Sequence, residues 1–233
     1  MRERVIDISS FRRPDAWLSG RGAIVHRSAP SVVRPGYERA KRVFDVTVCL
    51  LMLPFALVVL GVCALAVTIC DGRPIFFFQD RTGRGGRRFQ MIKFRTMVAN
   101  ATELKAELAS MNCLSGPDFK IANDPRITRL GAFLRKTSLD EVPQILNVLR
   151  GDMSLVGPRP TSFAADTYSL WHTERLEVLP GITGLWQVSG RSDVDFDDRV
   201  RLDIEYLEHR SFWFDLVILF RTVAALVQQR GAY

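Results

Sequence analysis

The hydrophobic pattern of this chain is dominated by one long apolar run. Residues 46–70 contain no charged side chain, and the run is bracketed by Asp45 and Asp71. About 20 consecutive apolar residues are enough for a helix to cross the hydrocarbon core of a bilayer. The pattern therefore predicts a membrane-embedded helix near the start of the chain.

Basic residues flank this run on both sides, and a proline lies inside it. The basic residues are Arg39, Lys41 and Arg42 before the run and Arg73, Arg81, Arg84, Arg87, Arg88 and Lys93 after it. Basic flanks favour the cytoplasmic side of a membrane, and Pro54 removes one helical hydrogen bond and bends the helix. A bent helix that enters the membrane and returns keeps both flanks in the cytoplasm, whereas a straight span keeps only one. We therefore expect a re-entrant helix over residues 39–72.

Shorter patterns of polar and apolar residues follow the run. Two β-prone stretches, residues 74–80 and 88–95, are joined by a glycine-rich turn and predict a β-hairpin. Helical periodicity is found near residues 98–109 and 129–149. Residues 212–227 are apolar apart from Asp215 and Arg221. They predict a helix that either lies in the membrane interface or packs on the core.

Together these elements predict an α+β fold that is mostly α-helical with a small β-hairpin. Residues 1–38 carry many arginines and little apolar periodicity, and they predict a basic, flexible tail that is either close to anionic lipid or simply solvated. The chain has 32 Lys and Arg against 25 Asp and Glu, a net charge of +7. Such a balance suits nucleic acid, an anionic membrane or a phosphate-rich substrate. The four cysteines form no CxxC pair, so neither a zinc site nor a disulfide framework is expected.

An adjacent pair of carboxylates, Asp140 and Glu141, is the clearest candidate for chemistry. Ser138-Leu-Asp-Glu141 has the form of a helix capping box, but Pro143 would then lose a hydrogen bond inside the helix. If Asp140 caps the helix instead, Pro143 falls where no intrahelical bond is expected. The carboxylates would then lie at the positive end of a helix, which favours their ionised form. An ionised Asp can act as a nucleophile, and a neighbouring Glu can bind a divalent ion.

Basic side chains lie close to this acidic pair in the sequence. Arg135 precedes the pair, and Arg159 follows it between Pro158 and Pro160, which stiffen the backbone that presents it. An arginine fork binds phosphate oxygens through two parallel hydrogen bonds. Each cation alone would suit a solvated surface, but together with the carboxylates and the membrane segment they indicate phosphoryl chemistry on a lipid.

Several longer motifs occur in a consistent order along the chain. They are Lys41-Arg-Val-Phe-Asp45, Pro74-Ile-Phe-Phe-Phe-Gln79, Lys93-Phe-Arg-Thr-Met97, Asp124-Pro-Arg-Ile-Thr128, Thr137-Ser-Leu-Asp-Glu-Val-Pro-Gln144, the segment from Asn147 to Pro160, Pro180-Gly-Ile-Thr-Gly184 and Gln187-Val-Ser-Gly-Arg191. On these motifs, from about residue 40 to residue 227, the chain resembles the monotopic polyprenyl-phosphate phosphoglycosyl transferases, also called bacterial sugar transferases. Members of this family start the assembly of exopolysaccharide, capsule and O-antigen.

The resemblance implies a membrane-anchored catalytic domain over residues 73–233, behind the re-entrant helix. It also implies that Asp140 attacks the phosphate of a UDP-sugar, releases UMP and forms a covalent phosphosugar intermediate that polyprenyl phosphate then attacks. Asp140 and Glu141 would be the catalytic residues and the ligands of a Mg²⁺ ion. The family's helix-breaking Ser-Pro is replaced here by Leu53-Pro54, which removes a hydroxyl that would satisfy freed backbone groups.

Further residues are expected to bind substrate phosphates. These are Arg159, Arg135, Lys93, Arg95 and Asp203. For Lys93 and Arg95 the alternative is a place on the outer face of a strand, and for Asp203 it is a charge on a helix surface. Residues 180–184 are expected to form a backbone turn near the nucleotide.

The partners implied are a UDP-sugar, polyprenyl (undecaprenyl) phosphate and inner-membrane lipid, with no nucleic acid. A homodimer is a further option. The expected location is the cytoplasmic face of the bacterial inner membrane, and the expected sugar is glucose or galactose, with an N-acetylated sugar as the alternative. A different class, a membrane adaptor that binds anionic lipid, explains the charge and the apolar run. It gives no reason for the acidic pair or for the segment Gly157-Pro-Arg-Pro160.

Overall fold

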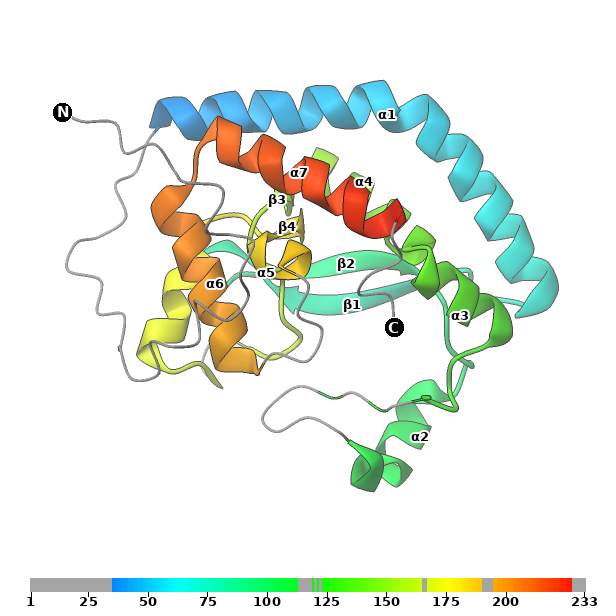
Figure 1. Cartoon of the computed structure of the whole chain (residues 1–233). Coiled ribbons are helices and arrows are strands. Elements are labelled where there is room, and N and C mark those ends of the chain that lie inside the picture. The colour runs from blue at the N-terminus through cyan, green and yellow to red at the C-terminus, as the bar shows by residue number, and fades with distance from the viewer. Residues whose placement is uncertain are drawn as a thin grey trace. The chain divides into compact units, whose positions relative to one another are not determined.

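A computed structural model describes residues 35–112, 119, 121, 123–164, 167–189 and 195–227. The chain divides into two compact units, residues 1–30 and 31–233, and every described residue belongs to the second. The basic tail predicted for residues 1–38 thus lies almost entirely outside the described residues. The described part is mostly helical with two small sheets (Figure 1), which confirms the expected helix-rich fold with a hairpin.

The apolar run forms helix α1 (Pro35–Cys70). By length and composition alone, this helix is long and apolar enough to cross a membrane. Pro54 lies inside it, and Figure 1 shows that α1 bends part-way along its length. Large apolar side chains stand exposed along much of the helix: Leu50, Leu51, Phe55, Leu57, Val58, Val62, Leu65 and Ile69. The membrane helix predicted from the sequence is therefore present as one continuous bent helix.

The N-terminal half of α1 packs against helix α7 (Phe212–Val227). The Asp215 carboxylate of α7 accepts hydrogen bonds from the Tyr37 hydroxyl at 2.7 Å and from Lys41 Nζ at 2.9 Å. Beside this contact, the rings of Phe44 and Phe212 meet edge to face, with centroids 4.9 Å apart. The helix predicted for residues 212–227 is confirmed, and its first turn binds α1 through a buried ion pair.

The C-terminal half of α1 packs against the other end of the same domain. Cys63 and Val67 share a buried cluster with Phe94 and Leu134. Just beyond the helix, the Arg95 guanidinium donates to the carbonyl oxygens of residues 71, 72 and 73. These carbonyl groups belong to the three residues that follow the helix, so Arg95 stabilises the point where the chain leaves α1.

The predicted hairpin consists of β1 (Phe76–Thr82) and β2 (Arg88–Phe94), which pair antiparallel. The turn between them contains the short helix η3 (Arg84–Gly86), whose Gly85 has φ 63°, a conformation that glycine adopts without strain. The Asn147 side chain completes the outer edge of β2, because it accepts from Ile92 N at 3.0 Å and donates to Gln90 O at 2.8 Å. An edge strand is thereby closed by one side chain rather than by another strand.

A second, parallel pair of strands was not predicted. It joins β3 (Ser154–Val156) to β4 (Gly181–Thr183). The expectation of a turn over residues 180–184 was wrong, because Gly181-Ile-Thr183 is extended and hydrogen-bonded to β3. A Cβ atom on Gly181 would collide with the backbone of Gly157, so glycine is required there for close strand approach rather than for a turn.

The remaining elements are short helices around these two sheets. They are α2 (Ala101–Glu107), η4 (Ala109–Met111), α3 (Arg129–Lys136), η5 (Leu139–Gln144), α4 (Ile145–Arg150), η7 (Leu170–Glu177), α5 (Leu185–Val188) and α6 (Phe196–His209). Residues 129–149, which were expected to be mostly helical, form α3, η5 and α4 in succession. Ser138 causes the division, since it adopts the left-handed conformation with φ 56°, which a helix does not tolerate in its interior.

Candidate active site

The acidic pair lies in the 3₁₀ helix η5, between α3 and α4. The prediction that Asp140 caps this helix was wrong: η5 begins at Leu139, after Ser138, and the Ser138 side chain makes no capping hydrogen bond either. Pro143 is accommodated because the segment is a 3₁₀ turn rather than the interior of a long α-helix. Asp140 and Glu141 still occupy the first turn of the element.

Glu141 is held between two cations from different parts of the chain. Its Oε1 atom accepts a 2.7 Å hydrogen bond from Lys93 Nζ on β2 and another hydrogen bond from the Arg159 guanidinium. Burial acts to raise the pKa of Glu141, but the charges of Arg159 and Lys93 outweigh it and hold that pKa far below its usual range. Glu141 is therefore an ionised carboxylate that fixes the positions of two cations.

Asp140 is buried beside Glu141 and Lys93, but its own contact with Lys93 is longer. Its Oδ2 atom lies 3.9 Å from Lys93 Nζ, and no hydrogen bond to its carboxylate is found among the described residues. Burial raises the pKa of Asp140, and the positive charge of Lys93 offsets part of that rise. The ionised form is thus less favoured than a helix start alone would predict, and the carboxylate keeps unshared lone pairs.

Arg135 approaches the pair from α3. Its Nε atom donates to Thr96 Oγ1 at 2.9 Å, which orients the guanidinium, and its charge lowers the pKa of Asp140. The helix that carries Arg135 lies close to the chain after β2. Glycine at position 131 allows this approach, since a Cβ atom there would collide with the Thr96 backbone. Three cations, Lys93, Arg135 and Arg159, therefore surround two carboxylates.

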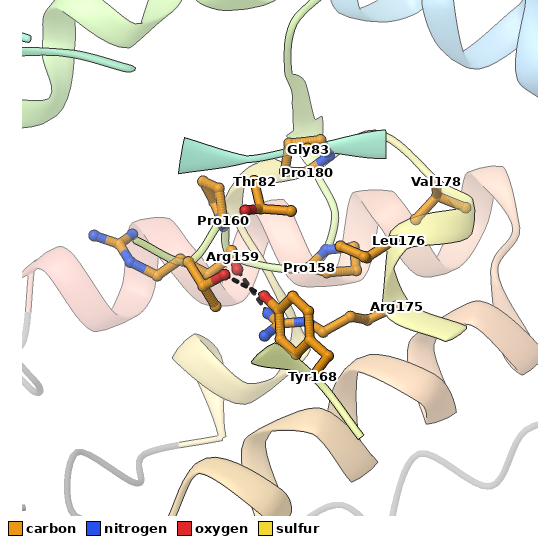
Figure 2. A pocket seen from close by; sticks show the side chains of 11 residues that line it. Thr82, Gly83, Pro158, Arg159, Pro160, Tyr168, Arg175, Leu176, Val178 and Pro180 are labelled. Carbon is orange, nitrogen blue, oxygen red and sulfur yellow. Dashed lines mark hydrogen bonds between the residues drawn. The ribbon is translucent and has the colours of Figure 1, made fainter. Parts of the chain in front are cut away.

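The segment that carries Arg159 is fixed by contacts to its backbone. The Arg81 guanidinium donates to Pro160 O at 3.1 Å, and Thr82 N donates to Thr161 O at 3.0 Å. On the other side, the Arg175 guanidinium donates to Arg159 O at 2.6 Å. Figure 2 shows that the Arg159 side chain points away from the small pocket that its backbone shares with Tyr168 and Arg175. This frame directs the guanidinium toward Glu141.

Two of the predicted phosphate-binding residues lie outside this cluster. Arg95 is turned to the carbonyl groups at the end of α1. Asp203 is fully buried on α6 and pairs with Arg175 at 2.5 Å. Burial raises the pKa of Asp203 to about 6, although Arg175 opposes the rise. Arg175 therefore connects Asp203 to the backbone of Arg159. This role of Arg175 was not foreseen, because an isolated arginine carries no sequence signal of its own.

The carboxylates also decide whether a Mg²⁺ ion fits. No group of three His, Cys, Asp or Glu side chains that would hold a metal occurs in the part of the chain that the structure describes. Protein-bound Mg²⁺, however, often takes only one or two carboxylates together with substrate phosphate oxygens. The Asp140 carboxylate is free of hydrogen bonds from the described residues, and Glu141 Oε2 has only a 3.4 Å contact to Arg159. The pair therefore fits a Mg²⁺ ion that is bound jointly with a diphosphate.

Comparison with known proteins identifies the class of protein that carries this site. Residues 36–229 match the family described as bacterial sugar transferase. The chain belongs to that family, which confirms the resemblance found in its motifs.

Individual relatives cover the chain to different extents. The undecaprenyl-phosphate galactose phosphotransferase of Salmonella typhimurium is 45% identical over 83% of this chain and 41% of its own length. The exopolysaccharide production protein ExoY of Rhizobium meliloti is 42% identical over 86% of this chain and 91% of its own length. The UDP-glucose:undecaprenyl-phosphate glucose-1-phosphate transferase of Caulobacter vibrioides is 39% identical over 86% of this chain and 74% of its own. The chain spans less than half the length of several of the relatives it matches.

Proposed function

We propose that this protein transfers a sugar-1-phosphate from a UDP-sugar to polyprenyl phosphate, and so starts the assembly of an exopolysaccharide, O-antigen or capsule-type glycan. The observation that carries the proposal is Asp140: a buried carboxylate without a hydrogen bond from the described residues, within 3.9 Å of Lys93. The surrounding cations suit a diphosphate, because phosphate oxygens bind charged donors most strongly.

In the first half-reaction, an Asp140 carboxylate oxygen attacks the phosphorus that bears the sugar. A new acyl-phosphate P–O bond forms, the P–O bond to the bridging oxygen breaks, and UMP leaves with that electron pair. Glu141 does not react. It keeps Lys93 and Arg159 beside the reacting phosphate, where their charges stabilise the negative charge that develops on the oxygens.

In the second half-reaction, a phosphate oxygen of the polyprenyl phosphate attacks the same phosphorus. The acyl-phosphate bond breaks, Asp140 regains its carboxylate, and polyprenyl-diphosphate-sugar is released. Two displacements at one carboxylate give ping-pong kinetics. A Mg²⁺ ion with Asp140 and Glu141 as its protein ligands would neutralise phosphate charge when bound.

Relatives support a hexose as the transferred sugar. One is named for galactose and another for glucose, so galactose or glucose is proposed here, with an N-acetylated sugar as the alternative. The proposed location is the cytoplasmic face of the inner membrane, with α1 as a re-entrant helix. The packing of both halves of α1 on one domain supports this arrangement.

The proposal is tested by trapping the intermediate. The protein is incubated with a UDP-sugar and no lipid acceptor, and its peptides are analysed by mass spectrometry. We expect a hexose-phosphate adduct on the peptide that contains Asp140, together with release of about one UMP per protein. Asp140→Asn should abolish the adduct and the activity, because the amide is not an anionic nucleophile.

Glu141→Gln serves as the matched variant for this experiment. It should slow the reaction strongly, because Lys93 and Arg159 lose their shared anchor, but it should leave the adduct on Asp140. Kinetics that require a ternary complex, with no adduct on any residue, would contradict the double displacement even if the overall reaction is correct.

A further inference from the structure

Strand β1 carries three consecutive phenylalanines that remain largely exposed. Phe76, Phe77 and Phe78 have exposed fractions of 36%, 45% and 55%. Successive residues of a strand point to opposite faces, so these side chains do not form one patch. Phe76 stacks on Phe94, with ring centroids 5.3 Å apart, which gives it a structural contact. Phe77 and Phe78 therefore need a separate explanation.

The register of the hairpin places Phe77 beside the candidate active site. Phe77 lies directly opposite Lys93 in the pairing of β1 with β2, whereas Phe78 lies opposite Ile92. Directly opposed residues share one face of the sheet, with Cβ atoms about 5 Å apart. Lys93 is the residue whose ammonium group binds Glu141 and approaches Asp140. Phe77 is thus an exposed aromatic group next to the cationic cluster.

The same part of the hairpin adjoins the end of the membrane helix. Arg95 N donates to Ile75 O at 2.9 Å, and the Arg95 side chain donates to the carbonyl groups that follow α1. Phe77, level with Lys93, is therefore two residues along the chain from Ile75, which contacts the residue that binds the end of α1.

We infer that Phe77 binds the first isoprenoid units of the polyprenyl phosphate acceptor while Lys93 and Arg159 bind its phosphate. This rests on the proposed function. An acceptor of this class has an anionic head and an apolar tail, and the surface offers cations and an exposed aromatic ring in the matching order. The tail needs apolar contacts next to the reacting phosphate, and the exposed ring of Phe77, directly opposite Lys93 in the hairpin, is placed to supply one.

The test separates the two half-reactions of the purified full-length protein in detergent micelles. The first is followed as the burst of UMP from UDP-galactose or UDP-glucose without acceptor. The second is followed as transfer to undecaprenyl phosphate and, in parallel, to the shorter farnesyl phosphate. The variants are Phe77→Ser, Phe77→Leu and the matched control Phe78→Ser, which changes the same residue type on the opposite face.

We expect Phe77→Ser to raise the KM for undecaprenyl phosphate about tenfold, equivalent to ~1.4 kcal/mol, and to leave the UMP burst unchanged. The burst also shows that the variant is folded. Phe77→Leu should stay within about threefold of the unmodified protein, because leucine retains most of the apolar area. Phe78→Ser should leave the KM for the acceptor unchanged.

Three results would overturn the inference. An unchanged KM for the acceptor in Phe77→Ser, or an equal rise in Phe78→Ser, would show that the ring makes no specific contact with the lipid tail. A change in the UMP burst or in the KM for the UDP-sugar would place Phe77 against the nucleotide instead. Absence of a burst from the unmodified protein would overturn the proposed function, and this inference with it.

Discussion

Lys93 determines the electrostatics of the candidate site at the scale of single residues. It contacts both carboxylates, Glu141 at 2.7 Å and Asp140 at 3.9 Å. Burial lowers the pKa of Lys93, and Glu141 opposes that shift. The same charge reduces the rise that burial imposes on the pKa of Asp140. In the proposed mechanism Asp140 must be ionised to attack phosphorus, so its reactivity would depend on Lys93.

This dependence predicts a change in the pH profile of the first half-reaction. Because the pKa of Asp140 is raised, the rate should increase with pH over a range above that of an ordinary aspartate. Lys93→Gln removes a charge that lowers this pKa, so the acid limb of the UMP burst should move to higher pH. Lys93→Arg keeps the charge and should leave the limb in place. A limb that does not move in Lys93→Gln would show that another group controls the profile.

Arg159 predicts a loss of rate when its charge is kept but its geometry is changed. The backbone contacts of Arg81 and Arg175 hold the segment so that the guanidinium meets Glu141. Arg159→Lys retains one positive charge and loses the planar fork that can bind phosphate oxygens through two parallel hydrogen bonds. Turnover should fall at least about tenfold, or ~1.4 kcal/mol of transition-state stabilisation.

The control for Arg159 is another arginine that pairs with a glutamate away from the site. Arg84 contacts Glu38 at 3.1 Å and is largely exposed. Arg84→Lys should leave steady-state turnover unchanged, because exposed ion pairs contribute little. Equal turnover in both lysine variants would remove Arg159 from the phosphate site.

At the scale of elements, β2 connects the site to the membrane helix. Its Lys93 faces the carboxylates, and Arg95, just after its end, binds the carbonyl groups that follow α1. Sequence reasoning expected either a phosphate contact or an exposed strand face for these residues. The structure gives them different surroundings, because the chain leaves the strand after Phe94 and turns toward the end of α1.

The place of Arg95 predicts a loss of stability rather than of chemistry. Arg95→Gln removes charged hydrogen bonds to three carbonyl groups, and unfolding in detergent should become easier by about 2–3 kcal/mol. Turnover per folded molecule should stay close to that of the unmodified protein. A large fall in turnover at unchanged thermal stability would instead support contact between Arg95 and the diphosphate.

At the scale of the whole molecule, both halves of α1 bind one domain. Tyr37 and Lys41 connect the first half to α7, and Cys63 and Val67 pack the second half against Phe94. A straight span would place the two ends of the helix on opposite sides of the bilayer and would separate one of them from these contacts. The packing therefore agrees with the re-entrant arrangement proposed above.

This arrangement predicts that both ends of the chain are cytoplasmic. Single cysteines in place of Arg2 and Tyr233, in a variant that lacks the native cysteines, should be protected from an impermeant thiol reagent in intact cells and labelled after permeabilisation. Both positions lie outside the described residues, so the experiment reports only their side of the membrane. Labelling of position 2 in intact cells would favour a straight span.

The sequence by itself determined the elements whose signals are local. The uncharged run predicted α1, the two β-prone stretches predicted the hairpin, and the apolar stretch before Val227 predicted α7. Short motifs also identified the acidic pair and the nearby arginines, because such motifs can be recognised in the sequence without knowing how the chain folds between them.

Tertiary structure alone decided which of these residues meet. Glu141 lies between Lys93 and Arg159 because β2, η5 and the segment after β3 converge. The pairing of β3 with β4, the burial of Asp203 against Arg175 and the turning of Arg95 toward α1 depend in the same way on contacts between distant segments. A side chain's partner and its pKa are set by burial and by charges from elsewhere in the chain, which no local pattern records.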